Sequence, residues 1–318
     1  MTPLRVAFFG TPAFAVPSLD ALLSSAHEVV GVVTQPDRPR GRGQQVSDAP
    51  VAARARAMGL SVLQPTRLKD PEFLDAFSAW QADIAIVAAY GRLLPQVLLD
   101  IPPRGMLNVH ASLLPAWRGA SPIQRAVLNG DAVSGVTIMR VVLALDAGPM
   151  LSRAELPIAA DDTSGSLELR LSVAGATLLL ATLDHMAHGD TVEEVPQDDA
   201  AATFAPRLEK AEGLIDWSRS AAALDCHVRG MQPWPGAFTF VDGQRLAVRE
   251  ASPDDRPAED VAPGGLVTTD GDAMLLACGD GRTLRIVRVQ PEGKRTMTAR
   301  EWLQGRRGTD AWRAGPPA

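Results

Sequence analysis

The sequence predicts an α/β domain with a doubly wound, mostly parallel Rossmann-like sheet, followed by a small C-terminal β-barrel of the OB type. The first observation is length, because 318 residues exceed the usual size of one domain. The second is an alternation of apolar runs and helix-like segments in the first part of the chain. The third is a later series of short strands with Gly, Pro and Asp turns. We therefore expect domains at 1–189 and 208–318, with a linker at 190–207.

Several apolar runs of the first domain are too uniformly apolar for a sheet with one exposed face, which favours parallel strands covered by helices on both sides. The predicted strands are 4–9, 28–34, 83–88, 106–109 and 135–142. The predicted helices are 15–25, 50–58, 71–80, 122–129 and 164–187. Gly189 provides a stop signal after the last helix.

The short strands of the second domain predict a small barrel or sandwich. The dipeptides Asp242-Gly243 and Asp280-Gly281 are typical of tight turns between strands. The predicted strands are 238–241, 246–250, 265–269, 273–278 and 283–289. The polar, non-periodic segment that precedes them is typical of a linker.

Composition restricts the class of protein. Hydrophobic residues make up 46% of the chain and charged residues 21%, as in an ordinary soluble globular protein. Cys226 and Cys278 show no spacing pattern, so we expect no metal, no disulfide framework and a reducing cytoplasmic location. The N-terminus lacks a signal peptide's apolar stretch, and no apolar run approaches the roughly 20 residues needed to cross a bilayer. We expect a monomer with no membrane partner.

Charge is distributed unevenly along the chain. The net charge is −6, yet the segment 282–307 contains eight Lys or Arg residues against Glu292 and Glu301, a net +6. The rest of the chain therefore has a net charge of −12. Such asymmetry is a hint of a region that faces nucleic acid, although a solvated basic surface would look the same.

Two loops near the N-terminus differ in what they can bind. Gly10-Thr11-Pro12 follows the first strand but lacks the glycines of a dinucleotide site, and Pro12 has no N–H for a phosphate. A nicotinamide dehydrogenase is thereby disfavoured. The loop Gln35–Gly43 is rich in Pro and Gly and cannot be a helix or a central strand. Its arginines, Arg38, Arg40 and Arg42, are candidates for phosphate contacts, and a solvated loop is the alternative.

The segment from Asn108 to Pro115 is the strongest indication of chemistry. Strand alternation places Asn108 and His110 on one side and Val109 on the other. An amide and an imidazole that converge can stabilise an oxygen gaining negative charge, and the imidazole can also transfer protons near neutral pH. Asp146 follows another apolar run, where it is either a turn residue or an active-site acid. The other four histidines are interpreted as surface or core residues.

Together these motifs resemble the folate-dependent formyltransferase family. The resemblance rests on Asn-Val-His at 108–110, Ser-Leu-Leu-Pro at 112–115, Trp-Arg-Gly-Ala-Ser-Pro-Ile-Gln at 117–124 and Leu-Asp-x-Gly at 145–148. The Gln35–Gly43 loop, Asp-Trp-Ser at 216–218, Gln-Pro-Trp-Pro-Gly at 232–236 and the segment 291–297 resemble the branch of this family that acts on methionyl-tRNA. The likeness extends from Leu4 to about Gly305.

The resemblance implies a catalytic α/β domain, a β-barrel domain that helps to hold tRNA, and 10-formyltetrahydrofolate as donor. It implies a folate site lined by Ser112, Leu113, Leu114 and Pro115. Arg42 resembles a residue that engages the acceptor arm of tRNA, and the resemblance adds Lys294 and Arg295 as tRNA contacts. It names Asn108, His110 and Asp146 as the catalytic residues.

The function that follows is transfer of a formyl group to the α-amine of methionyl-initiator tRNA. Asn108 and protonated His110 would stabilise the oxyanion of the tetrahedral intermediate, while Asp146 orients His110 and helps to move the amine's proton. The alternative within the enzyme class is a formyltransferase for a small amine, either an amino sugar or a purine precursor. A non-catalytic RNA-binding protein would have no use for these three residues together.

Overall fold

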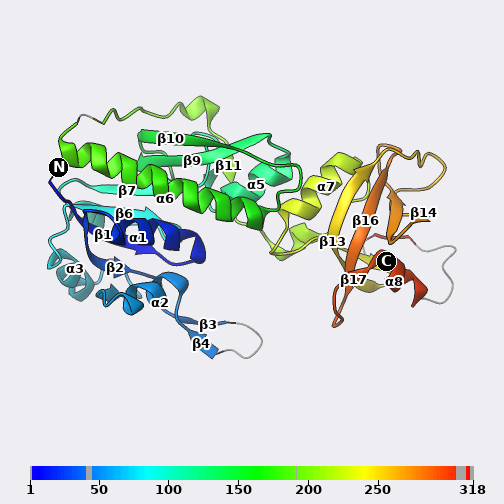
Figure 1. The fold of residues 1–318 in the computed structure, drawn as a ribbon, viewed down its shortest axis with the longest axis horizontal. Coiled ribbons are helices and arrows are strands. Elements are labelled where there is room, and N and C mark those ends of the chain that lie inside the picture. The colour runs from blue at the N-terminus through cyan, green and yellow to red at the C-terminus, as the bar shows by residue number, and fades with distance from the viewer. Residues whose placement is uncertain (1, 41–44, 191, 306–312, 316–318) are drawn as a thin grey trace. The chain divides into compact units, whose positions relative to one another are not determined.

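The computed structural model describes residues 2–40, 45–190, 192–305 and 313–315, and for 38–40 and 45–47 it describes the backbone only. The chain divides into two compact units (Figure 1). Unit 1 comprises Met1–Pro122, Val133–Pro157 and Glu168–Pro206, and unit 2 comprises Ile123–Ala132, Ile158–Leu167 and Arg207–Ala318. Unit 2 thus includes two segments that lie within the predicted first domain, 1–189, and the sequence-based boundaries at 189 and 208 stay a prediction.

Unit 1 contains a seven-stranded sheet in the order β10-β9-β7-β6-β1-β2-β5. Its strands are β1 (Arg5–Gly10), β2 (Glu28–Val33), β5 (Val62–Leu63), β6 (Ile84–Ala88), β7 (Met106–His110), β9 (Val133–Arg140) and β10 (Met150–Pro157). The first five run parallel, whereas β9 is antiparallel to both β7 and β10. The predicted doubly wound, mostly parallel sheet is confirmed, and β10 is an edge strand that the sequence analysis missed.

The helices begin where the sequence provides start signals. They are α1 (Val16–Leu23), α2 (Pro50–Ala57), α3 (Pro71–Ser78), α4 (Gln96–Leu99), α5 (Pro122–Asn129) and α6 (Ser164–His188). In α3, Pro71 occupies the first turn and Asp70 caps it by accepting a hydrogen bond from the Glu72 N–H. Each predicted helix is present within a few residues of its expected bounds.

Helix α6 packs closely against one face of β7, so only the opposite face of the strand is accessible to a substrate. A Cβ added at Gly175 would lie 2.8 Å from Val109 Cγ1, so only glycine allows this approach. Val109 therefore faces α6, which lies in front of the sheet in Figure 1. Because side chains alternate along a strand, Asn108 and His110 project from the opposite face.

Helix α6 is also the one helix in the described part of the chain that is long and apolar enough, by length and composition, to cross a membrane. Its 25 residues include Leu171, Leu179 and Leu183, each fully buried. Core helices of soluble proteins meet the same criterion, so this is weak evidence for a membrane span.

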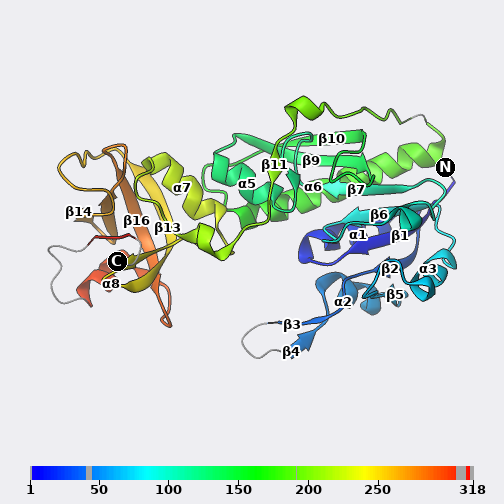
Figure 2. The ribbon, with the colours of Figure 1, turned by 180° about the vertical axis from the view of Figure 1, so that it is seen from behind.

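The segment after α6, predicted as a linker, pairs with unit 1. Val195 forms a β-bridge with Met150, and β11 (Phe204–Ala205) pairs with β8 (Arg118–Gly119) in parallel. Figure 2 shows this segment returning past β10 towards β11. Its hydrogen bonds place polar side chains from the 190s beside the loop that follows β9.

Unit 2 contains a curled antiparallel sheet in the order β12-β13-β16-β15-β14, with β17 on β16, and it confirms the predicted small C-terminal β-barrel domain. The strands are β12 (Phe238–Val241), β13 (Gln244–Asp254), β14 (Leu266–Asp270), β15 (Ala273–Ala277), β16 (Thr283–Pro291) and β17 (Met297–Thr298). Helices α7 (Ala221–Gly230) and α8 (Ala299–Gln304) pack Leu224, Val228 and Leu303 into its core. Thr298 and Glu301 form a capping box at the start of α8.

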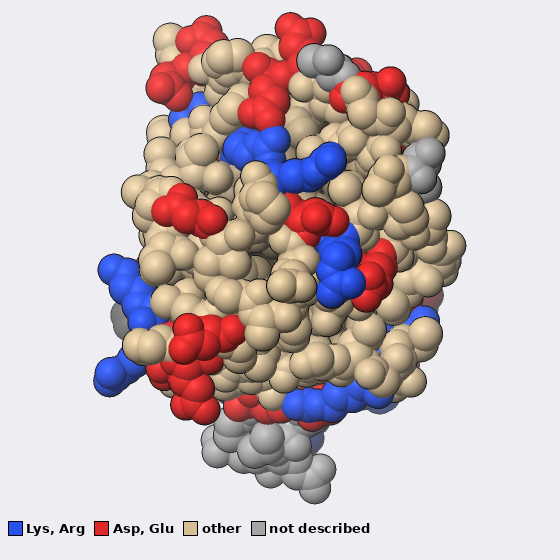
Figure 3. Space-filling model, turned by 90° about the vertical axis from the view of Figure 1, so that its left-hand side faces the viewer, with Lys and Arg blue, Asp and Glu red and all other residues tan. Residues whose placement is uncertain are grey.

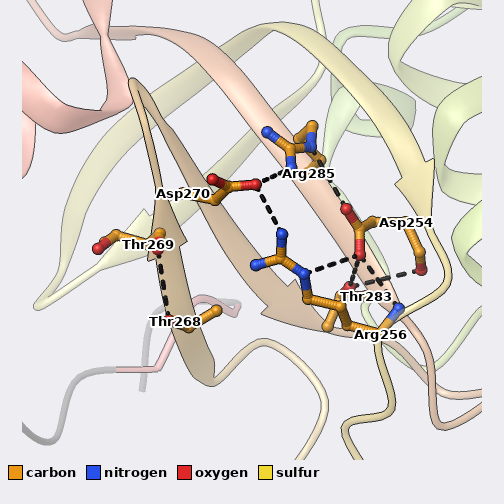
Figure 4. A network of polar contacts seen from close by, with 7 residues as sticks. All are labelled: Asp254, Arg256, Thr268, Thr269, Asp270, Thr283 and Arg285. Carbon is orange, nitrogen blue, oxygen red and sulfur yellow. Dashed lines mark hydrogen bonds and ion pairs between the residues drawn. The ribbon is translucent and has the colours of Figure 1, made fainter.

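Four charged side chains form a network on this barrel (Figure 4). Asp270 accepts hydrogen bonds from Arg285 and, at 2.6 Å, from Arg256, while Asp254 pairs with Arg285 at 3.4 Å. The hydrogen bonds from Arg285 and then Arg256 lower the pKa of the Asp270 carboxyl below its ordinary value of 3.8. The network joins β13, β14 and β16.

Replacing Asp270 by asparagine is expected to lower the Tm near neutral pH. A carboxyl whose pKa is lowered by folding stabilises the fold above its unfolded pKa, and that contribution is lost as pH falls through the folded pKa. The Tm difference between wild type and Asp270→Asn should therefore be largest above about pH 4 and vanish on acidification. Thermal unfolding between pH 7 and pH 2.5 tests this.

Asp255→Asn is the control, because Asp255 forms an exposed pair with Arg282 that we expect to contribute little to stability. A Tm difference for Asp270→Asn that grows on acidification would contradict the prediction.

Candidate active site

Strand β7 and the loop after β9 bring His110 and Asp146 together. Because β9 is antiparallel to β7, its last residue, Arg140, lies opposite Leu107 near the start of β7. The following loop folds back until Asp146 Oδ2 lies 3.8 Å from His110 Nδ1. Both side chains are largely buried, and Asp146 has a left-handed φ of 48°. A non-glycine residue adopts this conformation at an energetic cost, so the surrounding contacts must hold it there.

The His110 ring is oriented by the backbone. Its Nε2 lies 3.1 Å from the Trp117 carbonyl oxygen. A carbonyl only accepts hydrogen bonds, so this contact assigns the proton to Nε2. Nδ1 is then the ring nitrogen that faces Asp146.

Asn108 lies two residues before His110 in β7, opposite Met139 of β9, and is partly exposed. The strand therefore presents an amide and an imidazole on one face, as predicted from their spacing. The amide N–H groups suit an oxyanion, and the imidazole with its nearby carboxylate suits proton transfer.

The Asp146 carboxylate is held from a second side by Gly119, whose N–H donates to Oδ2 at 2.9 Å. Gly119 has a φ of 125°, and a Cβ at this position would lie 2.7 Å from the Ala205 carbonyl oxygen. Only glycine fits here. Sequence reasoning included Gly119 in a motif but gave it no role.

Val141 and Val142, the last two residues of the predicted strand 135–142, lie instead in this loop, and exposed apolar residues follow them. Strand β9 ends at Arg140, and Leu143 and Leu145 are 60% and 50% exposed. The prediction was wrong because an apolar run that borders a binding site has the same composition as one buried in a sheet. The loop provides an apolar rim beside Asp146.

The segment Ser112–Pro115 is fixed by internal hydrogen bonds. The Ser112 hydroxyl donates to the Ala116 carbonyl at 2.6 Å, and the buried Thr137 hydroxyl donates to the Ser112 carbonyl at 2.7 Å. Ser112 and Leu114 are buried, whereas Leu113 and Pro115 are partly exposed. Leu113 and Pro115 can contact a ligand directly, while Ser112 and Leu114 shape the loop.

A second polar cluster lies where β1, β2 and β6 end. The Tyr90 carbonyl accepts hydrogen bonds from Gln35 Nε2 at 2.7 Å and from the Thr11 hydroxyl at 3.4 Å. Ala89 and Gly91 have φ values of 46° and 79°, so this turn is left-handed on both sides of Tyr90. Ligands in α/β folds bind at this edge of the sheet. The sequence analysis did not single out this turn.

The predicted tRNA contacts are distributed over both units. Arg38 and Arg40 belong to β3 (Arg38–Arg40), which pairs with β4 (Gln45–Ser47) outside the main sheet, and Arg42 lies outside the described residues. Lys294 and Arg295 are exposed, and Arg295 pairs with Glu301 at 3.2 Å.

The basic excess of segment 282–307 is partly offset in space. Arg282 pairs with Asp255 at 2.6 Å, and Arg285 pairs with Asp254 and Asp270. These carboxylates lie outside the basic segment, so the linear count overstates its positive charge. Figure 3 shows a face of unit 1 instead, on which acidic and basic side chains are also interspersed.

Three other potentially reactive side chains, Cys278, His227 and His27, are buried and lie outside this cluster. Burial raises the pKa of the Cys278 thiol to about 12, and burial lowers the pKa of His227. His27 is buried and accepts a hydrogen bond from the Leu4 N–H at 3.2 Å. Among the described residues, no group of three or more His, Cys, Asp or Glu side chains could hold a metal ion.

Asn108 and His110 on β7 and Asp146 on the loop after β9 form a set of groups that suits a group-transferring enzyme. Residues 4–183 match the formyl transferase family model, and residues 207–307 match the model of the formyl transferase C-terminal domain. The methionyl-tRNA formyltransferase of Citrifermentans bemidjiense is 45% identical over 305 residues, which cover 96% of this chain and 94% of that protein. That of Gluconobacter oxydans is 46% identical over 303 residues, which cover 95% and 97%. The chain belongs to the formyl transferase family, in its methionyl-tRNA formyltransferase branch.

Solved structures share the fold at low sequence identity. An N-formyltransferase from Helicobacter canadensis has a TM-score of 0.68 and 15% identity, with 91% of this chain and 99% of that chain covered. HypX from Aquifex aeolicus, solved in complex with tetrahydrofolic acid, has a TM-score of 0.65 and 17% identity. The match covers 95% of this chain but only 47% of HypX, about half its length. At these identities the likeness concerns the fold alone.

Proposed function

We propose that the chain transfers the formyl group of 10-formyltetrahydrofolate to the α-amine of methionine esterified to initiator tRNA. The observation that carries this proposal is the 45% identity to methionyl-tRNA formyltransferases over 96% of the chain. It includes the β-rich C-terminal unit as well as the unit with Asn108, His110 and Asp146. The reaction takes place in the cytoplasm as part of translation initiation, and the tRNA is the macromolecular partner.

In this reaction the neutral amine attacks the formyl carbon, a new C–N bond forms, and the oxygen becomes an oxyanion. The Asn108 amide donates a hydrogen bond to that oxygen, and protonated His110 donates a second through Nδ1. The bond from the formyl carbon to the folate nitrogen then breaks, and one proton passes from the amine to that nitrogen. Asp146, 3.8 Å from Nδ1, stabilises the charged imidazole while the proton is in transit.

The remaining residues bind the two substrates. Leu113 and Pro115 contact the folate, and Ser112 and Leu114 hold the loop that presents them. Arg38, Arg40 and Arg42 in unit 1 and Lys294 and Arg295 in unit 2 contact phosphates of the tRNA. The support for these roles is the match of their motifs to the family and the exposure of Lys294 and Arg295.

A small amine, such as an amino sugar or a purine precursor, is the alternative acceptor. The sugar 3N-formyltransferase WlaRD covers the chain with a TM-score of 0.67 but is only 14% identical, which concerns the fold alone. The methionyl-tRNA branch is therefore the better-supported choice.

The test is formyl transfer from 10-formyltetrahydrofolate to methionyl-initiator tRNA, methionyl-elongator tRNA and free methionine, compared in kcat/KM. We expect transfer confined to the initiator tRNA. Equal transfer to both tRNAs would contradict the initiator assignment. Folate binding without transfer to any of the three would move the acceptor to a small amine.

A further inference from the structure

Both ends of the Gln197 side-chain amide are fixed, one by the Asp146 loop and the other by Arg118. Its Nε2 donates to the Asp146 carbonyl at 2.8 Å and to the Gly148 carbonyl at 2.7 Å. Its Oε1 accepts a hydrogen bond from Arg118 Nε at 3.0 Å. The residue comes from the segment after α6, 51 positions beyond Asp146 in sequence, and it lies within unit 1 as Asp146 does.

The contacts form a closed ring. Arg118 is buried, with 6% exposure, and connects through its side chain to Gln197. Gln197 holds the backbone of Asp146, and the Asp146 carboxylate accepts a hydrogen bond from Gly119, the next residue after Arg118. The ring therefore fixes both the backbone and the carboxylate of Asp146 with respect to the strand that carries Gly119.

The Asp146 backbone needs such support because its φ of 48° lies in the left-handed region, which is unfavourable for a non-glycine residue. Two hydrogen bonds to the carbonyls on either side of Ala147 resist relaxation of the loop. If the loop relaxed, the carboxylate would leave the neighbourhood of His110, and a displacement of about 1 Å can cost on the order of 100-fold in rate.

We propose that Gln197 is a positioning residue for the formyl transfer, which holds the Asp146 carboxylate beside His110 by clamping the loop through the Asp146 and Gly148 carbonyls. This inference rests on the proposed function. The side chain must be an amide, because it donates to two carbonyls with one end and accepts from an arginine with the other. A carboxylate of the same shape would keep the Arg118 contact but place an oxygen against two carbonyl oxygens.

The decisive variant is Gln197→Glu. We expect kcat to fall by about 10- to 100-fold with KM changed by less than about threefold, because the loop is displaced while the substrate sites remain. Gln197→Met, which removes the polar ends at similar size, should behave likewise. Asp198→Ala is the matched control, since Asp198 is exposed on the same segment and caps only Ala200. Its kcat should stay within about twofold of wild type. A kcat for Gln197→Glu within threefold of wild type would overturn the inference.

A second readout needs no activity. The Gly119 amide donates to the Asp146 carboxylate at 2.9 Å, whereas the Arg118 amide donates to the Thr203 carbonyl at 2.9 Å. In Gln197→Glu, hydrogen exchange at Gly119 should accelerate by about tenfold or more while exchange at Arg118 stays within about threefold. Equal acceleration at both amides would mean that the whole segment has loosened, and unchanged exchange at Gly119 would mean that Asp146 has not moved. Either result contradicts the inference.

The pairwise test separates this inference from the proposed function. In an Asp146→Asn background, Gln197→Glu should lower kcat by less than about a further threefold, because the group that it positions is already impaired. An additional tenfold loss would show that Gln197 acts elsewhere. If Asp146→Asn alone left kcat unchanged, the proposed role of Asp146 would fail. If Asp146→Asn were costly and Gln197→Glu were not, only the role of Gln197 would fail.

Discussion

Replacing Asn108 or His110 by alanine is expected to lower kcat/KM for formyl transfer by about 100- to 1,000-fold, the usual result of removing one oxyanion donor. Both side chains project from the same face of β7, and α6 covers the other face. When one of these two donors is removed, the other stabilises only part of the oxyanion's charge. It therefore cannot compensate for the loss. Steady-state rates with methionyl-initiator tRNA measure the effect.

The control for His110→Ala is His185→Ala, an exposed histidine on α6. It should leave kcat/KM within about twofold of wild type, as surface substitutions usually do. A loss of tenfold or less in either Asn108→Ala or His110→Ala would remove that residue from the oxyanion site. Melting curves of each variant separate loss of chemistry from loss of fold.

The substitution Gly148→Ala is expected to reduce both activity and stability. A Cβ on Gly148 would lie 1.9 Å from the Arg140 carbonyl oxygen, which cannot give way easily because the Arg140 N–H is bonded to the Pro149 carbonyl at 2.8 Å. The loop must move, so we expect a loss of about 1–3 kcal/mol in the free energy of unfolding. The displacement of Asp146 should lower kcat by about 100-fold.

Denaturant unfolding and initial rates measure these two effects. Gly305→Ala serves as comparison, since its Cβ would meet no atom closer than 3.5 Å. It should change neither quantity appreciably. Wild-type activity in a destabilised Gly148→Ala protein would mean that the loop accommodates the methyl group without moving Asp146.

The central strands could be predicted because burial on both faces requires uniformly apolar runs, and the helices because burial on one face leaves an apolar period of 3.6 residues. The direction of β9 could not, since an apolar run has the same composition in either direction. For that reason Asp146 was expected after a strand, whereas it is reached by a loop that folds back along β7. Val141 and Val142 were assigned to the strand because an exposed apolar segment has the same composition as a buried one.

The site was predictable where side chains share a strand. The spacing of Asn108 and His110 is enough to put them on one face. Their distance from Asp146, however, depends on how β7, the loop after β9 and the segment after α6 pack together. Gln197 had no local signal, because a glutamine in a polar segment is ordinary until its partners are known. The pairing of Arg282 and Arg285 with carboxylates was hidden for the same reason.

The close approach of α6 and β7 constrains how this chain can change over generations. Any residue larger than glycine at position 175 would push Val109, and Val109 is covalently joined to the two residues that face the reaction. We therefore expect selection for catalysis to act on position 175, although it lies on the side of the sheet away from the chemistry. The geometry of the proposed oxyanion site would then restrict substitutions at a residue that never touches it.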